Sequence, residues 1–278
     1  MLFSRIGEHI RPLRMNLLKN IIAMAMMFLT LLPTGHFFAG IDPYVLGMFM
    51  LSGAVGIGVG DSAYFAALNH IGPRRSLILW TLSPPLTAIM AIVFLGEYLT
   101  TWAWIGVLLT VGGIAWVITE RMPGGDETES RKLRGILFGL IAALGQATGA
   151  VLAHAAFLHM NVSPLRSALL RLIGGTIIVL FFLSLDRKFA VRATRQKPPA
   201  ILWLLVPFTV FIGTYLGIWL QQISLKHTAA GIAQTLLATS PLFVLPMAIW
   251  MGERVSPRAF IGAAIAIAGV ALLFGFHS

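Results

Sequence analysis

The chain of 278 residues is 58% hydrophobic and only 11% charged, with a formal net charge of +10 and no cysteine. Soluble domains carry about 45–50% apolar and about 25% charged residues, so this composition excludes a water-soluble protein and predicts one embedded in a lipid bilayer. The lack of cysteine excludes disulfides and thiolate metal sites. The basic residues lie in the gaps between apolar runs, a pattern typical of membrane topology signals rather than of nucleic-acid binding.

A bilayer core of about 30 Å requires about 20 apolar residues per helix. The sequence predicts nine such spans, at residues 17–38, 44–68, 76–95, 102–119, 135–158, 165–184, 201–224, 229–250 and 259–276. The basic residues before the apolar run from Ile21 to Leu32 also resemble a signal peptide. The internal repeat described next favours a retained helix instead.

The chain contains an internal repeat. The segment "PLRMNLLKN" at 12–20 matches "PLRSALLRL" at 164–172 with an offset of 152, which places Lys19 on Arg171. A second match has an offset of 156 and pairs residues 72–99 with 228–255, Pro85 with Pro241, Glu97 with Glu253, and Gly106 with Gly262. Five spans separate equivalent points, and an odd number inverts the second copy in the membrane. Inverted repeats are typical of secondary transporters, whose substrate binds near the midplane between the halves.

We therefore expect one membrane domain built from two halves. Residues 1–119 form the first half with four spans, 120–134 form a polar linker, and 135–278 form the second half with five spans. The first half lacks a counterpart of span 135–158, and two interpretations are open: the protein works with nine spans, or its first helix lies upstream of the recorded start.

The distribution of Lys and Arg predicts the orientation. Alternating spans place every Lys and Arg on one side, except Arg166, Arg171 and Lys226. We therefore expect a protein of the plasma (inner) membrane with its N-terminus in the cytoplasm and its C-terminus outside.

Two long segments, "GDSAYFAALNHIGPRRSLILWTLSPPLTAIMAIVFLGEYL…" and "LQQISLKHTAAGIAQTLLATSPLFVLPMAIWMGERV…AGVALL", share an ordered set of features. Each has "AL" or "SL" before a polar turn, Ser-Pro in the next helix, "GE" at its end and a Gly-rich final helix. These segments resemble the two EamA repeats of the drug/metabolite transporter superfamily. The resemblance implies an all-α polytopic bundle of inverted five-helix repeats that moves small metabolites by alternating access. The missing first helix departs from that pattern, as does a C-terminus outside, since family members are expected to keep both termini in the cytoplasm.

Polar and aromatic residues inside the spans are the candidate substrate-binding residues. Asp61 is the carboxylate predicted deepest in a span, where charges are costly and face a cavity or a partner. Two interpretations of Asp61 are open. It is either a site for proton coupling or for a substrate amine, or it forms a hydrogen bond to the backbone of a neighbouring helix. His154 shares one helix face with Gln146, and here substrate contact and a helix–helix hydrogen bond are both open. The remaining candidates are Tyr64, Trp80, Gln221, Gln222 and Gln234.

Two repeated pairs are interpreted as structural or hinge residues. Pro85 and Pro241 remove a backbone donor inside a helix and favour a bend, which is either a gating hinge or fixed. Glu97 and Glu253 each lie in the turn between the last two helices of a half. There, we expect each to accept hydrogen bonds from the amides at the N-terminus of the next helix.

The sequence predicts a secondary transporter that exports a small metabolite or drug-like compound, coupled to protons. The neutral, amide-rich and aromatic candidates favour amphipathic or aromatic metabolites over polyanions. Motifs of hydrolases and nucleotide-binding enzymes are absent from the sequence, so an enzyme is not expected. A membrane-embedded enzyme acting on lipid-linked substrates and a non-transporting lipid-scrambling or assembly protein are the alternatives. The expected partners are the small-molecule substrate and the bilayer; a homodimer is left open, and nucleic acid, metal and cofactors are not expected.

Overall fold

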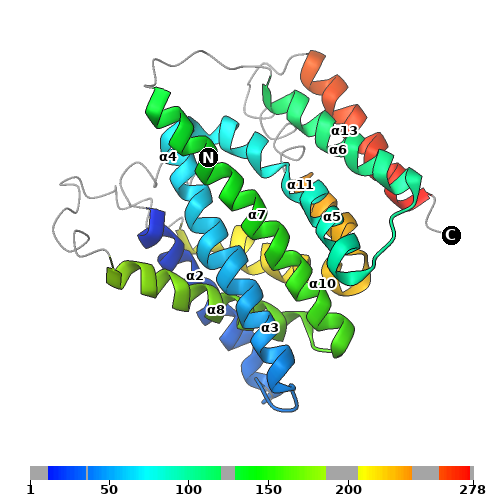
Figure 1. Ribbon diagram of the computed structural model, residues 1–278. Coiled ribbons are helices and arrows are strands. Elements are labelled where there is room, and N and C mark those ends of the chain that lie inside the picture. Colours follow the sequence, from blue (N-terminus) through cyan, green and yellow to red (C-terminus); the bar gives the residue numbers. More distant parts are fainter. Residues whose placement is uncertain (1–11, 36, 120–128, 186–205, 240–256, 276–278) are drawn as a thin grey trace.

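The computed structural model describes residues 12–35, 37–119, 129–185, 206–239 and 257–275, and every regular element in them is helical. The first part of the chain forms α2 (Pro12–Leu31), the short 3-10 helix η1 (Leu32–Thr34), α3 (Pro43–Gly53), η2 (Ala54–Asp61), α4 (Ser62–Trp80), α5 (Ser83–Leu95) and α6 (Thr101–Thr119). The second part forms α7 (Glu129–His159), α8 (Pro164–Leu185), η4 (Phe211–Leu216), α10 (Gly217–His227), α11 (Ala230–Ala238) and α13 (Pro257–Gly275), as Figure 1 shows.

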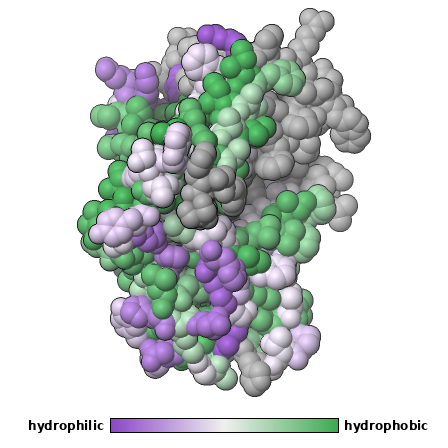
Figure 2. Space-filling view, turned by 90° about the vertical axis from the view of Figure 1, so that its right-hand side faces the viewer, coloured by the Kyte–Doolittle hydropathy of each residue, from purple (hydrophilic) through white to green (hydrophobic). Residues whose placement is uncertain are grey.

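The described residues include six helical stretches that are long and apolar enough to cross a membrane. They are Leu13–Thr34, Pro43–Pro73, Arg75–Leu95, Glu129–His159, Pro164–Leu185 and Val206–His227. The second and third stretches divide α4 at a kink, where Gly72 has a non-helical backbone with φ of 76° and ψ of 169°. Large hydrophobic side chains face outward along these helices and cover much of the surface visible in Figure 2. The prediction of a polytopic helical membrane protein is thus confirmed.

Three of the nine predicted spans do not correspond to a described helical stretch that is long and apolar enough to cross a membrane. Spans 102–119 and 259–276 correspond to the shorter apolar helices Thr101–Trp116 and Phe260–Leu272. Span 229–250 begins with α11, and its residues from 240 onward lie outside the described residues. The total of nine spans therefore stays a prediction.

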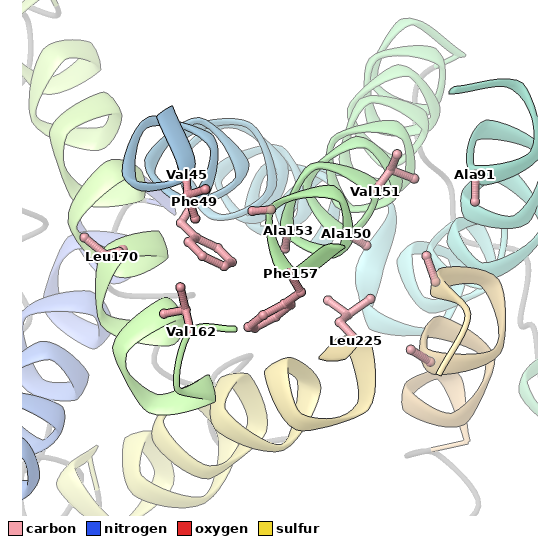
Figure 3. Packing of buried hydrophobic residues seen from close by; sticks show 13 residues of the cluster. Val45, Phe49, Ala91, Ala150, Val151, Ala153, Phe157, Val162, Leu170 and Leu225 are labelled. Atoms are coloured by element: carbon pink, nitrogen blue, oxygen red, sulfur yellow. The ribbon is translucent and has the colours of Figure 1, made fainter. Parts of the chain in front are cut away.

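Helix α7 is the central element of the bundle and contacts α3, η2, α4, α5, α10 and α11. Figure 3 shows the buried cluster where α3, α7, α8 and α10 converge. The rings of Phe49 and Phe157 meet edge to face there, with centroids 5.0 Å apart. Burial of such aromatic side chains and their edge-to-face contact stabilise the crossing of α3 and α7.

Two π-helical segments interrupt the long spans. The first, η2, is continuous with α3 and α4, and the second, η4, precedes α10. Subtracting the repeat offset of 156 from 211–216 gives 55–60, which lies within η2. The wider turns therefore recur at positions that the sequence repeat pairs. Such turns occur frequently at functional sites.

The bend expected at Pro85 lies just before it. Helix α4 ends at Trp80 and α5 begins at Ser83, so Pro85 occupies the first turn of α5. A proline is tolerated there because the first turn of a helix has no intrahelical acceptor for its missing N–H. Pro241 lies outside the described residues, and a hinge role for either proline stays a prediction.

Glycines set the closest helix crossings. A Cβ added to Gly53 of α3 would lie 1.8 Å from the carbonyl oxygen of Arg171, and one added to Gly174 of α8 would lie 2.0 Å from that of Met50. Helices α6 and α13 lie side by side in Figure 1 through a similar contact, with a Cβ on Gly113 only 2.6 Å from the carbonyl oxygen of Gly262. In a membrane, small residues let helices pack at backbone contact.

The α3–α8 crossing is tested by adding one methyl group. Gly53→Ala is expected to lower the melting temperature of the detergent-purified protein, since overpacking costs roughly 1–3 kcal/mol. Gly47→Ala on the same helix is the matched control, because a Cβ there meets nothing within 4 Å. Equal melting temperatures for the two variants would contradict this crossing.

Candidate functional site

A central cavity of about 250 Å³ lies among helices from both parts of the chain. Its lining includes five of the residues singled out from the sequence: Asp61, Trp80, Gln146, Gln221 and Gln234. Lys19, Ser83 and Thr214 add polar groups, and Ile57, Pro84 and Ile218 add apolar surface. The cavity therefore combines one charged side, several amides and one aromatic wall.

The charged side of the cavity is an ion pair between two helices. The Nζ atom of Lys19 on α2 lies 2.5 Å from Oδ2 of Asp61 at the end of η2. The side chains are 7% and 22% exposed, so the pair is largely shielded from solvent. Asp61 thus lies inside a span as predicted, and its partner is a lysine side chain rather than a helix backbone.

Lys19 corrects one assignment of the charge count. The sequence interpretation counted it with the basic residues of the cytoplasmic side, near the start of the predicted span 17–38, whereas it lies well within α2 and is buried. Asn16 lies on the same face of α2 and donates from Nδ2 to the carbonyl oxygen of Ile57 and to Oγ of Ser62, both at 2.9 Å. These bonds hold α2 against η2, so Lys19 reaches Asp61.

The glycines of "GIGVGD" explain how Asp61 comes near Gln146. A Cβ on Gly145 of α7 would lie 3.1 Å from Cα of Gly60, and one on Gly60 would lie 3.4 Å from the backbone nitrogen of Gln146. The absence of side chains on both helices brings η2 and α7 into backbone contact. Asp61 and Gln146, adjacent to these glycines, consequently line the same cavity.

A second buried cation lies behind the amides of the cavity. Arg171 of α8 is fully buried, and its Nη1 donates to Oε1 of Gln221 at 3.1 Å. Its Nε and Nη2 atoms have no hydrogen-bond partner among the described residues. Nε2 of Gln234, which lines the cavity, is likewise buried without a partner in the described part of the chain. Buried donors normally have acceptors, so these groups call for an explanation.

Tyr64 and Gln222 do not line the cavity. The ring of Tyr64 packs against Trp80, with centroids 4.8 Å apart, and supports the aromatic wall from behind. Gln222 is fully buried, and its Oε1 accepts a hydrogen bond from Oγ of Ser167 at 3.2 Å. Tyr64 touches the site through Trp80, whereas Gln222 joins α10 to α8.

His154 belongs to a different contact, at the end of the bundle that holds the α5–α6 and α10–α11 turns. Its Nδ1 donates to the carbonyl oxygen of Leu225, and its Nε2 lies 2.8 Å from Oε1 of Glu97. Oε2 of Glu97 accepts from the backbone nitrogen of Ala230 at 3.2 Å. We call these four residues the Glu97 cluster. Of the two interpretations of His154, the structure shows the helix–helix contact.

Glu97 differs from expectation in the helix that it caps. It accepts from the N-terminus of α11, not from α6, the next helix along the chain. Gly96 ends α5 in a left-handed conformation with φ of 66°, and Thr100 caps α6 by accepting from the backbone nitrogen of Ala103 at 3.2 Å. The carboxylate still meets the positive end of a helix dipole, but across the bundle. Glu253 lies outside the described residues.

Sequence reasoning missed two charged residues at the site, Lys19 and Arg171. Both were interpreted as topology signals, because each lies near one end of an apolar run. The signal that identifies them is the repeat itself, which places Lys19 on Arg171. Charged residues inside membrane helices usually face a cavity or a partner, so two cations at matched positions of the sequence repeat are a signal of a functional site.

A polytopic helical bundle with a partly charged cavity between its helices is the architecture of a membrane transporter. The EamA-like transporter family matches residues 1–119 and 133–275, and the chain belongs to this family. The resemblance noted from the sequence is therefore confirmed.

Individual relatives are more distant. A protein of Streptantibioticus cattleyicolor named "Probable terminal-alkyne amino-acid exporter" is 27% identical over 239 residues, which cover 82% of this chain and 73% of that protein. The "Uncharacterized transporter YyaM" of Bacillus subtilis is 22% identical over 232 residues, covering 80% and 71%. A crystal structure of a protein with 17% sequence identity has a TM-score of 0.74 and covers 98% of this chain and 93% of the other, which shows a shared fold.

The ion pair predicts non-additive effects on stability. Lys19→Met leaves the Asp61 carboxylate without its cation, so we expect the purified protein to melt at a lower temperature. The double variant Lys19→Met/Asp61→Asn removes both charges and should recover part of the loss, with a coupling free energy on the order of 0.5–3 kcal/mol. Additive changes in the double-mutant cycle would show that the two residues do not interact.

Proposed function

We propose that the protein is a secondary carrier that exports a small amphipathic metabolite in exchange for protons, by alternating access around the central cavity. The observation that carries the proposal is the Lys19–Asp61 pair in a cavity lined from both parts of the chain. The likeness to a protein named an amino-acid exporter supports export of a small metabolite. The volume of about 250 Å³ suits a compound of amino-acid size.

The proposed architecture is two inverted repeats, residues 1–119 and 135–278, joined by the linker 120–134 and containing nine spans. The two π-helices at repeat-equivalent positions support this division. The close pairing of α6 with α13, which are equivalent at the same offset, supports a pseudo-twofold relation between the halves. Alternating access then consists of one half rocking against the other around the cavity.

Asp61 is the proposed proton-coupling residue. Protonation removes the negative charge that holds Lys19, and this weakens the contact between α2 and η2. In a membrane interior the attraction between two charges is strong because the local dielectric constant is low, so the gain or loss of one proton changes the relative energies of two conformations. Asp61 therefore cannot bind a proton and form an ion pair with Lys19 at the same time. Proton coupling requires such an exclusive choice.

The Glu97 cluster is the proposed closure at one end. It joins the α5–α6 turn to α7 and to the start of α11 through two oxygen atoms of one carboxylate. Both ring nitrogens of His154 face oxygen acceptors, an arrangement that a doubly protonated imidazole satisfies. Opening this end requires Glu97 to leave His154 and Ala230.

Proton coupling is tested with Asp61→Asn in proteoliposomes, with radiolabelled L-leucine and L-phenylalanine as first probes. We expect flux driven by a pH gradient to fall roughly 100-fold or more, the range by which removal of a proton-transfer group slows turnover. Asp42→Asn is the matched control, because Asp42 caps α3 outside the cavity and Asn caps equally well. Unchanged gradient-driven flux in Asp61→Asn would refute the coupling role.

We also propose that the protein lies in the plasma (inner) membrane with the N-terminus in the cytoplasm and the C-terminus outside. When the buried Lys19 and Arg171 are left out of the count of Lys and Arg on the two sides of the membrane, the excess on the cytoplasmic side remains. The two exceptions are held by loop carbonyl groups: Arg166 donates to Phe37 and Ala39, and Lys226 donates to Val162.

Reporter fusions test this orientation. Alkaline phosphatase fused after Ser278 should be active, because it folds only outside the cytoplasm, and a green fluorescent protein at the same point should be dark. Fusions after truncation within the 120–134 linker should give the opposite pair of signals. A fluorescent, phosphatase-negative fusion after Ser278 would place the C-terminus in the cytoplasm.

A further inference from the structure

Lys19 and Arg171 are buried cations at repeat-equivalent positions, yet within the described part of the chain only Lys19 forms an ion pair with a carboxylate. Lys19 contacts Asp61, whereas Arg171 hydrogen-bonds only to the neutral amide of Gln221 among the described residues. The negative charge of Asp61 also attracts Arg171, but the Asp61 carboxylate is already paired with Lys19. An uncompensated charge in a protein interior is strongly unfavourable, so the described site is short of one negative charge.

The asymmetry between the halves shows where that charge is absent. The offset of 156 places Asp61 on Gly217, and the whole stretch Val206–His227 contains no acidic residue. Gly217 lines the central cavity, and a Cβ added there would meet only one atom within 4 Å, the carbonyl oxygen of Ile212 at 3.8 Å. The position that holds a carboxylate in the first half therefore opens onto the cavity in the second half.

Two amide nitrogens and an ammonium group at the cavity are hydrogen-bond donors. Nε2 of Gln234 is buried without a partner among the described residues and belongs to the cavity lining. Arg171 fixes the amide of Gln221 by donating to its Oε1, so the Nε2 group of Gln221 remains to donate. Lys19 adds an ammonium group at the same wall. Such a set of donors is complementary to an acceptor that carries negative charge.

We propose that the missing anion is the carboxylate of the transported metabolite, bound beside Gly217 by Lys19 and the two glutamine amides. Arg171 is the positioning residue that holds Gln221 and supplies the second positive charge. In the empty carrier Asp61 forms an ion pair with Lys19. When the ligand binds, its carboxylate replaces Asp61 as the partner of Lys19. Asp61 can then accept a hydrogen bond from the ammonium group of an amino acid. The apolar side chain then packs against Trp80 and Ile218. This inference rests on the proposed export function, because it names the substrate class of that site.

Four probes of similar apolar size separate the charges of the ligand. L-Leucine has a carboxylate and an ammonium group, isocaproate has only the carboxylate, and leucinamide and isoamylamine have only the cationic group. Binding is measured as a concentration-dependent rise in melting temperature of the full-length protein in detergent, since a ligand that binds only the folded state stabilises it. We expect L-leucine and isocaproate to stabilise the protein, and leucinamide and isoamylamine to have no effect.

Gly217→Asp is the decisive variant, because it restores the carboxylate that the second half lacks. We expect it to weaken isocaproate binding roughly 10- to 100-fold, the range of a lost hydrogen bond to a charged group. Gly217→Asn has nearly the same shape without the charge and should retain binding. Asp61→Asn should bind isocaproate more tightly than the wild type, since the internal competitor for Lys19 is removed; a merely structural role of Asp61 would not produce this result.

Substitution of the cations completes the test. Lys19→Met and Arg171→Met should lose isocaproate binding, whereas Lys132→Met and Arg134→Met, at exposed positions on α7, should keep it. Should Arg171→Met fail to fold, Arg171→Lys keeps a charge but not the fork that holds Gln221, and is expected to bind isocaproate about tenfold more weakly.

Equal stabilisation by leucinamide and L-leucine, no stabilisation by either carboxylate, or unaltered binding in Gly217→Asp would each overturn the carboxylate site. Because binding is measured without a membrane gradient, failure of proton-driven export leaves this result intact. Conversely, coupled export of a ligand without a carboxylate refutes the site and not the export function.

Discussion

Backbone contact between glycine-rich helices is the constraint on which the site depends. Gly149 of α7 and Gly175 of α8 pack against η2 so closely that a Cβ would lie 2.9 Å from Cα of Gly56 and 2.8 Å from Cβ of Ile57. The contact with α7 places Asp61 and Gln146 on the same cavity, where Lys19 of α2 pairs with Asp61. In a bilayer, packing of this kind is the main source of helix association, because lipid is as apolar as the helices themselves. The charges are therefore held in place by a scaffold of small residues.

The sequence permits a correct prediction of features that are local or periodic. Helical character and membrane insertion follow from the length of the apolar runs, and Asp61 is visible because a carboxylate inside such a run is rare. Five of the eight proposed substrate-binding residues line the cavity, since amides and aromatics within spans tend to face protein or water.

The features that could not be predicted depend on contacts distant in sequence. A lysine at the start of an apolar run looks the same whether it flanks the membrane or enters it, and only the packing of α2 on η2 decides for Lys19. Glu97 caps a helix that begins 133 residues later, which no local pattern indicates. Likewise, His154 faces the carbonyl group of Leu225 rather than the cavity because α10 crosses α7 at that level.

The two polar clusters of the bundle differ in a way that suits different roles. The Glu97 cluster closes on itself, with one carboxylate meeting an imidazole and the positive end of α11. The central cavity has a surplus of donors and of positive charge among the described residues, with Arg171 and Gln234 incompletely paired. An ion-pair contact and a helix cap between elements stabilise one conformation of the bundle, whereas unmatched donors beside a cavity are stabilised by whatever enters it. A carrier requires both kinds of cluster, because the ligand shifts the balance between conformations only through interactions that the empty protein lacks.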